Sequence, residues 1–132
     1  MDFIKQISNY LTKNAPLNAP LVSPILSSDA SSVAIRETPS SVGARYINKG
    51  KTLHFQFQIL VKDPSIIKAR ETINTIFTAI DGLPSAAITS TDGSFLMTKC
   101  ECSTLPSWVE TNERNEHIYT AIFVAEIEQG GK

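Results

Sequence analysis

The residues of this chain that could take part in chemistry are few and scattered. The two histidines, His54 and His117, each fall near the start of an expected strand, and neither has a Cys, Asp or Glu at ligand spacing. Cys100 and Cys102 would point to the same face of a strand, roughly 6.5–7 Å apart, which is too far for an unstrained disulfide. Because zinc needs more ligands than two thiols, we predict reduced cysteines and no metal site.

Motifs for catalysis or nucleotide binding are also missing from the sequence. Glycine-rich phosphate loops of the G-x-G-x-x-G or Walker type do not occur, and Ser94 in DGSFL does not match a nucleophile elbow. We therefore predict no catalytic residue, no cofactor and no enzyme activity. The rival interpretation, a small hydrolase using His54 or His117, requires a pocket in which a histidine meets a carboxylate within hydrogen-bond reach.

The charge of the chain is low and balanced. Charged residues make up 19% of the 132 residues, against about 25% in soluble domains, and the net charge is −1 with no basic stripe. A nucleic-acid groove is therefore not expected. Apolar runs are only a few residues long, and the N-terminus MDFIKQISNYL lacks the basic start and apolar centre of a signal peptide. We expect one domain over 1–132, no membrane segment, and synthesis in the cytoplasm.

The stretch KTLHFQFQILVKD, residues 51–63, alternates between apolar and polar residues and predicts a long strand over 52–62. Its apolar side, which includes Phe55 and Phe57, is expected to face a helix in the core. Base stacking by these two rings is not expected, because no basic residues lie near them. Its polar side is neutral and rich in amides, and consists of Thr52, His54, Gln56, Gln58 and Lys62.

Two helices are predicted from apolar residues at helical spacing. The first spans 3–13, with Asp2 as its cap, and ends at Asn14 and Pro16. The second spans 65–80, with Asp63 as N-cap and Pro64 at the first helical position. Gly82 suits the left-handed position that follows a helix.

The remaining segments are predicted as short strands, turns and an arm. Residues 14–31 hold three prolines and suggest an extended arm or irregular connection, with one short strand at 21–26. Further strands are expected over 32–37, 86–91, 95–103 and 117–128, with a loop over 40–51, a hairpin turn at 92–93, a charged turn at 111–116 and a flexible tail at 129–132. The bend 105–109 carries Trp108, either as a plug under the bend or as an interface anchor. The strand over 117–128 is apolar on both faces and should be central.

These elements predict an α+β fold, with a mostly antiparallel sheet, one main helix packed across it and a short N-terminal helix. The second face of the sheet is rich in amides and hydroxyls, and the arm and the 40–51 loop can reach outwards; these are features of a subunit in a ring or tube. An uncharged polar face can meet another subunit without leaving a charge buried and unpaired. The predicted contact residues are Arg36, Arg45, Tyr46, His54, Gln56, Gln58 and Trp108.

Five segments together carry a resemblance to a known family. They are DFIKQISNYL, VAIRETPSS, HFQFQILVKDPSIIKARETINTIFTAIDGL, TLPSWVETNERN and EHIYTAIFVAEIE. In their order and character, the chain resembles the small tail-terminator (tail-completion) proteins of long-tailed phages, in particular the minor capsid proteins of phages of Gram-positive bacteria. The resemblance covers nearly the whole chain, and its motifs are architectural and not chemical.

This resemblance implies a place in the virion, as a hexameric ring at the head-proximal end of the tail tube. Such a ring halts polymerisation of the tube protein and presents a surface to the head-side connector, with its sheet lining the ring and its helices outside. The implied partners are copies of the chain itself, the tail tube protein and the connector protein. Two alternatives remain open: a head–tail connector or neck component, and a cytoplasmic protein-binding module without a role in the virion.

Overall fold

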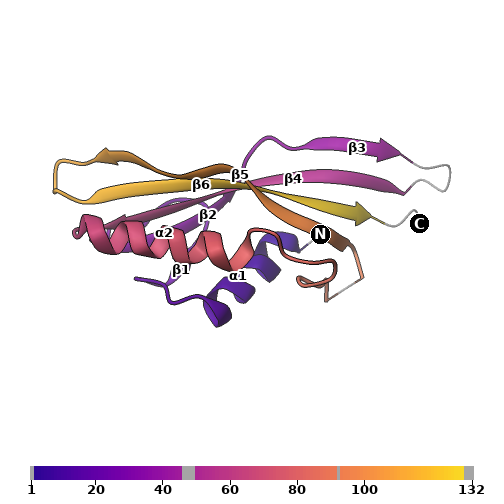
Figure 1. Cartoon of the computed structure of the whole chain (residues 1–132), viewed down its shortest axis with the longest axis horizontal. Helices are drawn as coiled ribbons and strands as arrows, with labels where there is room; N and C mark the ends of the chain where they lie inside the picture. Colours follow the sequence, from indigo (N-terminus) through magenta and orange to yellow (C-terminus); the bar gives the residue numbers. More distant parts are fainter. Residues whose placement is uncertain (1, 46–49, 92, 130–132) are drawn as a thin grey trace.

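A computed structural model of the chain describes residues 2–45, 50–91 and 93–129. The helices are α1 (Phe3–Asn14) and α2 (Ile66–Ile80). The strands are β1 (Leu21–Val22), β2 (Ser32–Glu37), β3 (Ser41–Arg45), β4 (Lys51–Asp63), β5 (Leu96–Thr111) and β6 (His117–Gln129). Figure 1 shows these elements along the long axis of the molecule.

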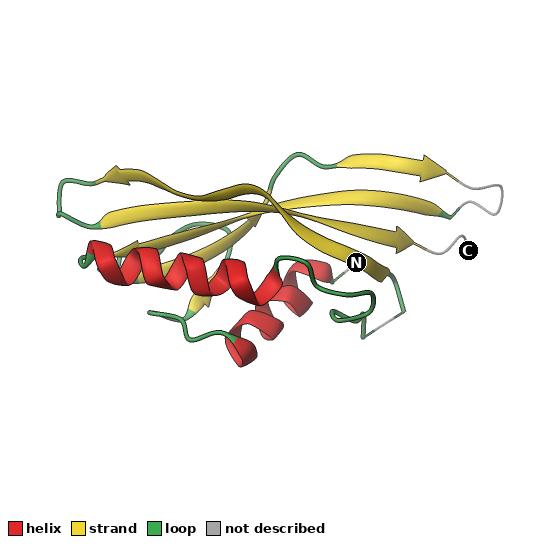
Figure 2. Cartoon of the chain, in the orientation of Figure 1, coloured by secondary structure: helices red, strands yellow, loops and turns green. Residues whose placement is uncertain are grey.

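The described strands form one sheet in the order β1-β2-β4-β6-β5, and β3 pairs with β4 off this path. All pairs are antiparallel except the two-residue pair of β1 with β2. Figure 2 shows both helices on one side of the sheet. The structure therefore confirms the predicted α+β class, the mostly antiparallel sheet, and the main helix across it.

The long strands β4 and β6 form the centre of the sheet, as their alternating patterns predicted. They pair without a register shift from Lys51 with Gln129 to Asp63 with His117. Phe57 lies opposite Phe123, and the two rings stack with centroids 5.6 Å apart on the side of the helices. Because side chains alternate across a strand, this register places every second residue of both strands in the core.

The helices cover this inner face with the residues of their apolar stripes. From α1, Phe3, Ile7 and Leu11 are fully buried. Phe3 makes edge-on contacts with the rings of Phe55, Phe57 and Phe95, at centroid distances of 5.0, 5.8 and 5.5 Å. From α2, the buried residues are Ala69, Thr72, Ile73, Ile76 and Ile80. The prediction that Phe55 and Phe57 face the core is therefore confirmed.

α1 starts at Phe3 with Asp2 at its N-cap position, as predicted, but the capping bonds of both helices differ from those expected. Ser65, and not Asp63, is the N-cap of α2, and its hydroxyl accepts a hydrogen bond from the Lys68 amide at 3.3 Å. Asp63 lies two residues before this cap, and its carboxylate accepts a hydrogen bond from the Ser65 backbone amide at 2.8 Å. The Asp2 side chain makes no capping bond to the backbone of α1 and accepts from Gln6 and Thr91 side chains instead. Gly82 has the expected left-handed backbone, with φ +75°.

Residues 41–45 form a strand, although 40–51 was predicted as a loop. β3 pairs with the first residues of β4, from Ser41 opposite His54 to Arg45 opposite Lys51. A register shift between Val42 and Ala44 lies at Gly43, which fits the use of glycine at irregular positions in strands. An edge strand can form with little apolar surface, so this segment lacks the alternating apolar residues by which a strand is predicted.

The segment after α2 was also predicted wrongly. Residues 86–91 form no strand; only isolated bridges join Leu83 to Cys100 and Thr89 to Leu96. The predicted turn residue Asp92 lies outside the described residues. In place of a strand ending at residue 103 and a separate bend, β5 runs unbroken from Leu96 to Thr111. Pro106 is tolerated because β5 is an edge strand, and register shifts accommodate the irregular stretch.

Residues 14–31 form the irregular connection that was one of the two predicted alternatives, and they do not reach outwards as an arm. Only Leu21 and Val22 form a strand, which pairs with β2 and is shorter than the expected strand over 21–26. Asn18 donates from its amide to the Lys62 carbonyl at 3.1 Å and to the Asp63 carboxylate at 2.9 Å. The segment, called the arm below, therefore packs on its own subunit. Of the predicted tail, only Gln129 is described, as the last residue of β6.

Both cysteines are free thiols, as predicted. Burial and, to a lesser extent, the Asp81 carboxylate raise the pKa of Cys100 to about 12. The same two causes raise the pKa of Cys102, which is only partly buried. With a pKa of about 12, about one Cys100 side chain in ten thousand is ionised near pH 8. Only this thiolate form is reactive, so Cys100 should react very slowly.

We therefore expect Cys100 to resist iodoacetamide near pH 8 in the folded protein, and Cys102 to react slowly. Both should react fully in urea, where burial is lost. Peptide mass spectrometry of the alkylated protein measures both rates. Rapid labelling of Cys100 without denaturant would show that its surroundings are open, contrary to its complete burial.

Candidate assembly interface

The sheet face opposite the helices is not covered by any described element (Figure 2). Its centre is made of side chains from β4 and β6 that are half-buried by their neighbours alone. This outer face comprises His54, Gln56, Gln58 and Leu60 of β4 and Ile118, Thr120, Ile122 and Val124 of β6. It joins neutral polar groups to aliphatic ones, a composition found at protein interfaces.

Hydrogen bonds hold the polar side chains of the outer face in place across three strands. Arg36 on β2 donates from Nε to the Gln58 side-chain oxygen at 2.8 Å, and Gln58 donates from Nε2 to the Thr120 hydroxyl at 2.8 Å. The Thr120 hydroxyl in turn donates to the Ile59 carbonyl at 3.0 Å. Beside this chain, Thr38 donates to the Gln56 side-chain oxygen at 3.0 Å. The Gln58 amide is thus paired through both its oxygen and its nitrogen, and the Gln56 amide through its oxygen, which lowers the desolvation cost of covering them.

Apart from Arg36 beside Gln58, the charged groups of the outer face lie at one end of it, around His54. A shallow cleft there is lined by His54, Lys99, Glu101, Cys102, Ser103, Val124 and Glu126. The Lys99 amine lies 3.4 Å from the Glu101 carboxylate and 3.9 Å from that of Glu126, and these exposed pairs contribute little to stability. No hydrogen bond joins His54 to Cys102 or Glu126, and the raised pKa of Cys102 opposes a nucleophilic role.

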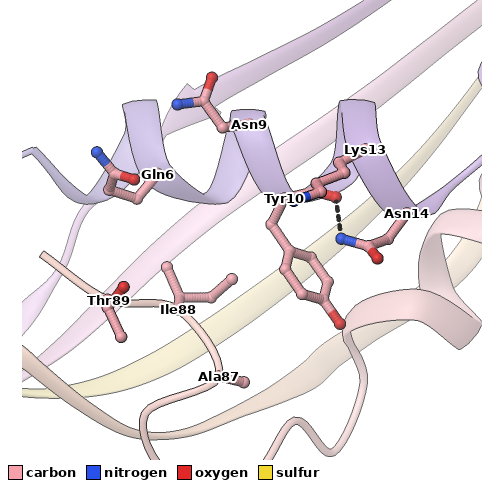
Figure 3. Close-up of a pocket in the computed structure, with 8 residues that line it drawn as sticks. All are labelled: Gln6, Asn9, Tyr10, Lys13, Asn14, Ala87, Ile88 and Thr89. Carbon is pink, nitrogen blue, oxygen red and sulfur yellow. Dashed lines mark hydrogen bonds between the residues drawn. The ribbon is translucent and has the colours of Figure 1, made fainter.

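Among the described residues, neither His117 nor the groove beside α1 brings a histidine and a carboxylate together in a hydrogen bond. The His117 ring pairs through Nδ1 with the Thr111 hydroxyl at 2.9 Å, across the turn between β5 and β6. The groove, about 380 Å³ in volume, lies between α1 and residues 87–89 (Figure 3). Its lining residues are Gln6, Asn9, Tyr10, Lys13, Asn14, Ala87, Ile88 and Thr89, which include no histidine, cysteine or carboxylate.

The structure brings together only some of the predicted contact residues. Arg36, His54, Gln56 and Gln58 share the outer face. Arg45 is the last residue of β3, opposite Lys51, and Tyr46 lies outside the described residues. Trp108 lies apart: its side chain is 54% exposed, and it pairs with Tyr119 on the side of the sheet that carries the helices. Trp108 is therefore not the core plug that one interpretation of the bend predicted.

A buried polar cluster at the arm is a feature that sequence reasoning missed. Lys62 is 6% exposed; its amine donates to the Ser27 carbonyl at 2.7 Å and lies 3.8 Å from the Glu116 carboxylate. Glu116 is 4% exposed and also accepts from the Asn112 amide at 2.8 Å. The cluster connects the arm to the ends of β4 and β6. This pairing could not be predicted, because Lys62 occupies a polar position of a strand and Glu116 lies in a charged turn, where both would be expected to be exposed.

Asp63 joins the same cluster, and its carboxylate stays ionised. Burial raises its pKa, but hydrogen bonds from Asn18, the Ser65 amide and Ser31 outweigh this and hold the pKa below its ordinary value. A lowered pKa in the folded state means that the carboxylate stabilises the fold above about pH 4, and that this stability is lost as the pH falls through the lowered value.

We expect Asp63→Asn to lower the free energy of unfolding near neutral pH and to lose less stability than the wild type between about pH 4 and pH 2. Urea unfolding across this range measures the difference. Asp29→Asn is the matched control, because Asp29 is exposed in the arm and should leave the pH profile unchanged. Parallel profiles for wild type and Asp63→Asn would contradict the role given to Asp63.

Comparison with known proteins decides the family. The family model for the bacteriophage tail terminator protein matches residues 26–129, which is most of the chain. The chain belongs to the bacteriophage tail terminator family. The match includes the outer face, β5, and the end of the arm. None of the curated proteins compared matches the chain.

A solved structure supports the fold of this tail terminator family member. A chain from the virion of a native gene transfer agent (GTA) particle superposes with a TM-score of 0.58, covering 96% of this chain and 97% of that chain at 11% identity. At this identity, the likeness concerns the fold alone.

Membership of the family makes this chain a structural tail protein of the virion that contacts other virion proteins. None of the described helices is both long and apolar enough to cross a membrane. The predicted resemblance and virion location are thus confirmed. That its phage infects Gram-positive bacteria stays a prediction.

Proposed function

We propose that this tail terminator protein caps the tail tube, stops its polymerisation and forms the joining surface to the head-side connector. In this proposal copies of the chain, each one domain over 1–132, form a hexameric ring at the end of the tube. One face of the ring occupies the interface that the last tube subunits leave open. The other face does not accept a further tube subunit, so growth stops without any bond being made or broken.

The uncovered outer face is the observation that carries this proposal. Both helices pack on the inner face, and no described element covers Gln58, Ile122 or Val124. A stable contact buries about 800 Å² on each partner, an area that a sheet face with its flanking hairpin can supply. Apart from the Arg36 guanidinium, which donates to Gln58, the side chains in the centre of this face are uncharged, so covering them leaves no isolated charge buried.

The contact residues of the proposal follow from this face. Arg36, Gln56 and Gln58 lie in its hydrogen-bonded centre, and His54 lies where the centre meets the charged cleft. Arg45 would extend the contact along β3, and Tyr46 follows it in the sequence. Trp108 would contribute to a separate contact on the other side of the sheet.

A charge placed in the centre of the outer face tests the proposal. Ile122 lies opposite Gln58, and we expect Ile122→Glu to weaken capping of growing tubes about tenfold or more, because the contact would bury an unpaired carboxylate. Ile122→Gln is the matched control, since it has the same size without the charge and should cap nearly as well as the wild type. The measurement is the length of tubes formed by the purified tube protein with each variant. Equal capping by both variants would place the contact elsewhere.

A further inference from the structure

The Arg36 guanidinium is the one charged group among the described residues at the centre of the outer face. Arg36 lies in a row across the sheet with Gln58 of β4 and Ile122 of β6. It is exposed, and no described carboxylate lies within ion-pair distance of it. The neighbouring acid Glu37 pairs with Phe57 and so belongs to the other side of the strand. The charge of Arg36 is therefore not neutralised within the described part of the chain.

A series of hydrogen bonds holds this guanidinium in place. The Thr120 hydroxyl donates its proton to the Ile59 backbone carbonyl at 3.0 Å, so towards Gln58 it can only accept, from Nε2 at 2.8 Å. This turns the Gln58 side-chain oxygen towards Arg36, where it accepts from Nε at 2.8 Å. Because a backbone carbonyl fixes the direction of the whole series, the guanidinium is positioned before any partner binds.

The far end of the guanidinium is free to bind a partner. Its Nε–H is used by Gln58, and the terminal nitrogens, Nη1 and Nη2, make no hydrogen bond to a described residue. These two nitrogens form a planar fork that matches the two oxygens of a carboxylate. A partner that covers the outer face would remove water from this fork, and a guanidinium buried without an anion would strongly oppose binding. The partner must therefore supply an anion at this point.

The surroundings of Arg36 favour a protein carboxylate over the phosphates of a nucleic acid. At the end of the same face, the cleft around His54 holds the carboxylates of Glu101 and Glu126 and the amine of Lys99. This excess of negative charge opposes a polyanion lying along the face. Beside Arg36 the row continues to the aliphatic Ile122, which suits a protein surface.

We propose that Arg36 recognises an Asp or Glu side chain of the tail tube protein, and that this pair helps to select the tube end as the partner of the outer face. The inference rests on the proposed function and names the chemistry that the tube must present there. A surface without the carboxylate would leave Arg36 buried and unpaired, so the same residue that attracts the tube end rejects other partners.

Capping of tubes by purified variants tests this pair. Arg36→Glu sets two carboxylates against each other and should weaken capping about tenfold or more. Arg36→Gln leaves the carboxylate of the tube unpaired and should weaken capping as well, whereas Arg36→Lys keeps the charge without the fork and should retain part of it. Lys5→Glu is the matched control, because it reverses a charge at an exposed site on α1 and should cap as the wild type does.

A compensating change in the tube protein separates recognition from a structural role of Arg36. Each Asp and Glu of the tube protein is replaced by Lys in turn, and the variants that still form tubes are offered to Arg36→Glu. One of them should restore capping, because it exchanges the two charges of the pair.

The other outcomes would overturn the inference. Equal capping by the wild type and Arg36→Glu, or no restoration by any tube variant, would remove the pair and leave the proposed function standing. A wild type that caps no tubes would remove both. If Arg36→Glu lowers instead the molar mass of the protein alone by light scattering, the carboxylate belongs to a second copy. If it abolishes binding of the wild type to duplex DNA, the anion is a phosphate.

Discussion

Replacing Phe57 by Ala is expected to lower the free energy of unfolding by about 3–5 kcal/mol. Phe57 is fully buried at the centre of β4, stacks on Phe123 and meets the edge of Phe3 from α1. The substitution therefore leaves a cavity where the sheet and the first helix meet. Since domains of this size are stable by only about 5–15 kcal/mol, the variant should be close to unfolding at physiological temperature.

Urea unfolding followed by circular dichroism measures this loss. Phe77→Ala is the matched control, because Phe77 is a half-buried ring on α2 and its removal should cost clearly less. A loss at Phe57 no larger than the loss at Phe77 would mean that the stacked rings are not the centre of the core.

The second large effect is expected at the buried polar cluster. Lys62→Met removes the charge that faces Glu116 and the donor to the Ser27 carbonyl, and it should cost about 3–5 kcal/mol because a buried carboxylate is left unpaired. The double variant Lys62→Met, Glu116→Gln removes both charges and should be more stable than Lys62→Met alone. The arm should also become more accessible to protease, since the bond to Ser27 is lost.

A double-mutant cycle of urea unfolding measurements gives the coupling of the two side chains. Lys5→Met is the control for loss of a lysine, because Lys5 is exposed on α1. Strictly additive losses at positions 62 and 116 would show that the 3.8 Å pair does not stabilise the fold.

The elements with long, regular patterns were the ones that the sequence predicted well. β4, α2 and β6 each carry a strong period of two or 3.6 residues over at least 13 residues, and their bounds in the structure lie within a residue or so of those expected. The neutral outer face followed from the same alternation, because the residues between Phe55, Phe57 and Ile59 had to point the other way.

The elements that were missed depend on neighbours that a local pattern does not record. β3 is a strand because β4 offers it an edge, and β5 continues through Pro106 because its outer side has no ladder to break. The arm is fixed by contacts such as Asn18 with Asp63 and Arg114 with the Ser28 carbonyl, which join residues far apart in the sequence. The exposure of Trp108 follows from the path of β5 and could not be read from its loop-like surroundings.

The length of tail tubes in particles made without this protein tests the central claim most directly. Electron microscopy of such particles should show tubes that vary in length and exceed the normal value, because nothing occupies the growing end. Tubes of normal length that are left unattached to heads would contradict the account, since they are the result expected of a connector or neck component.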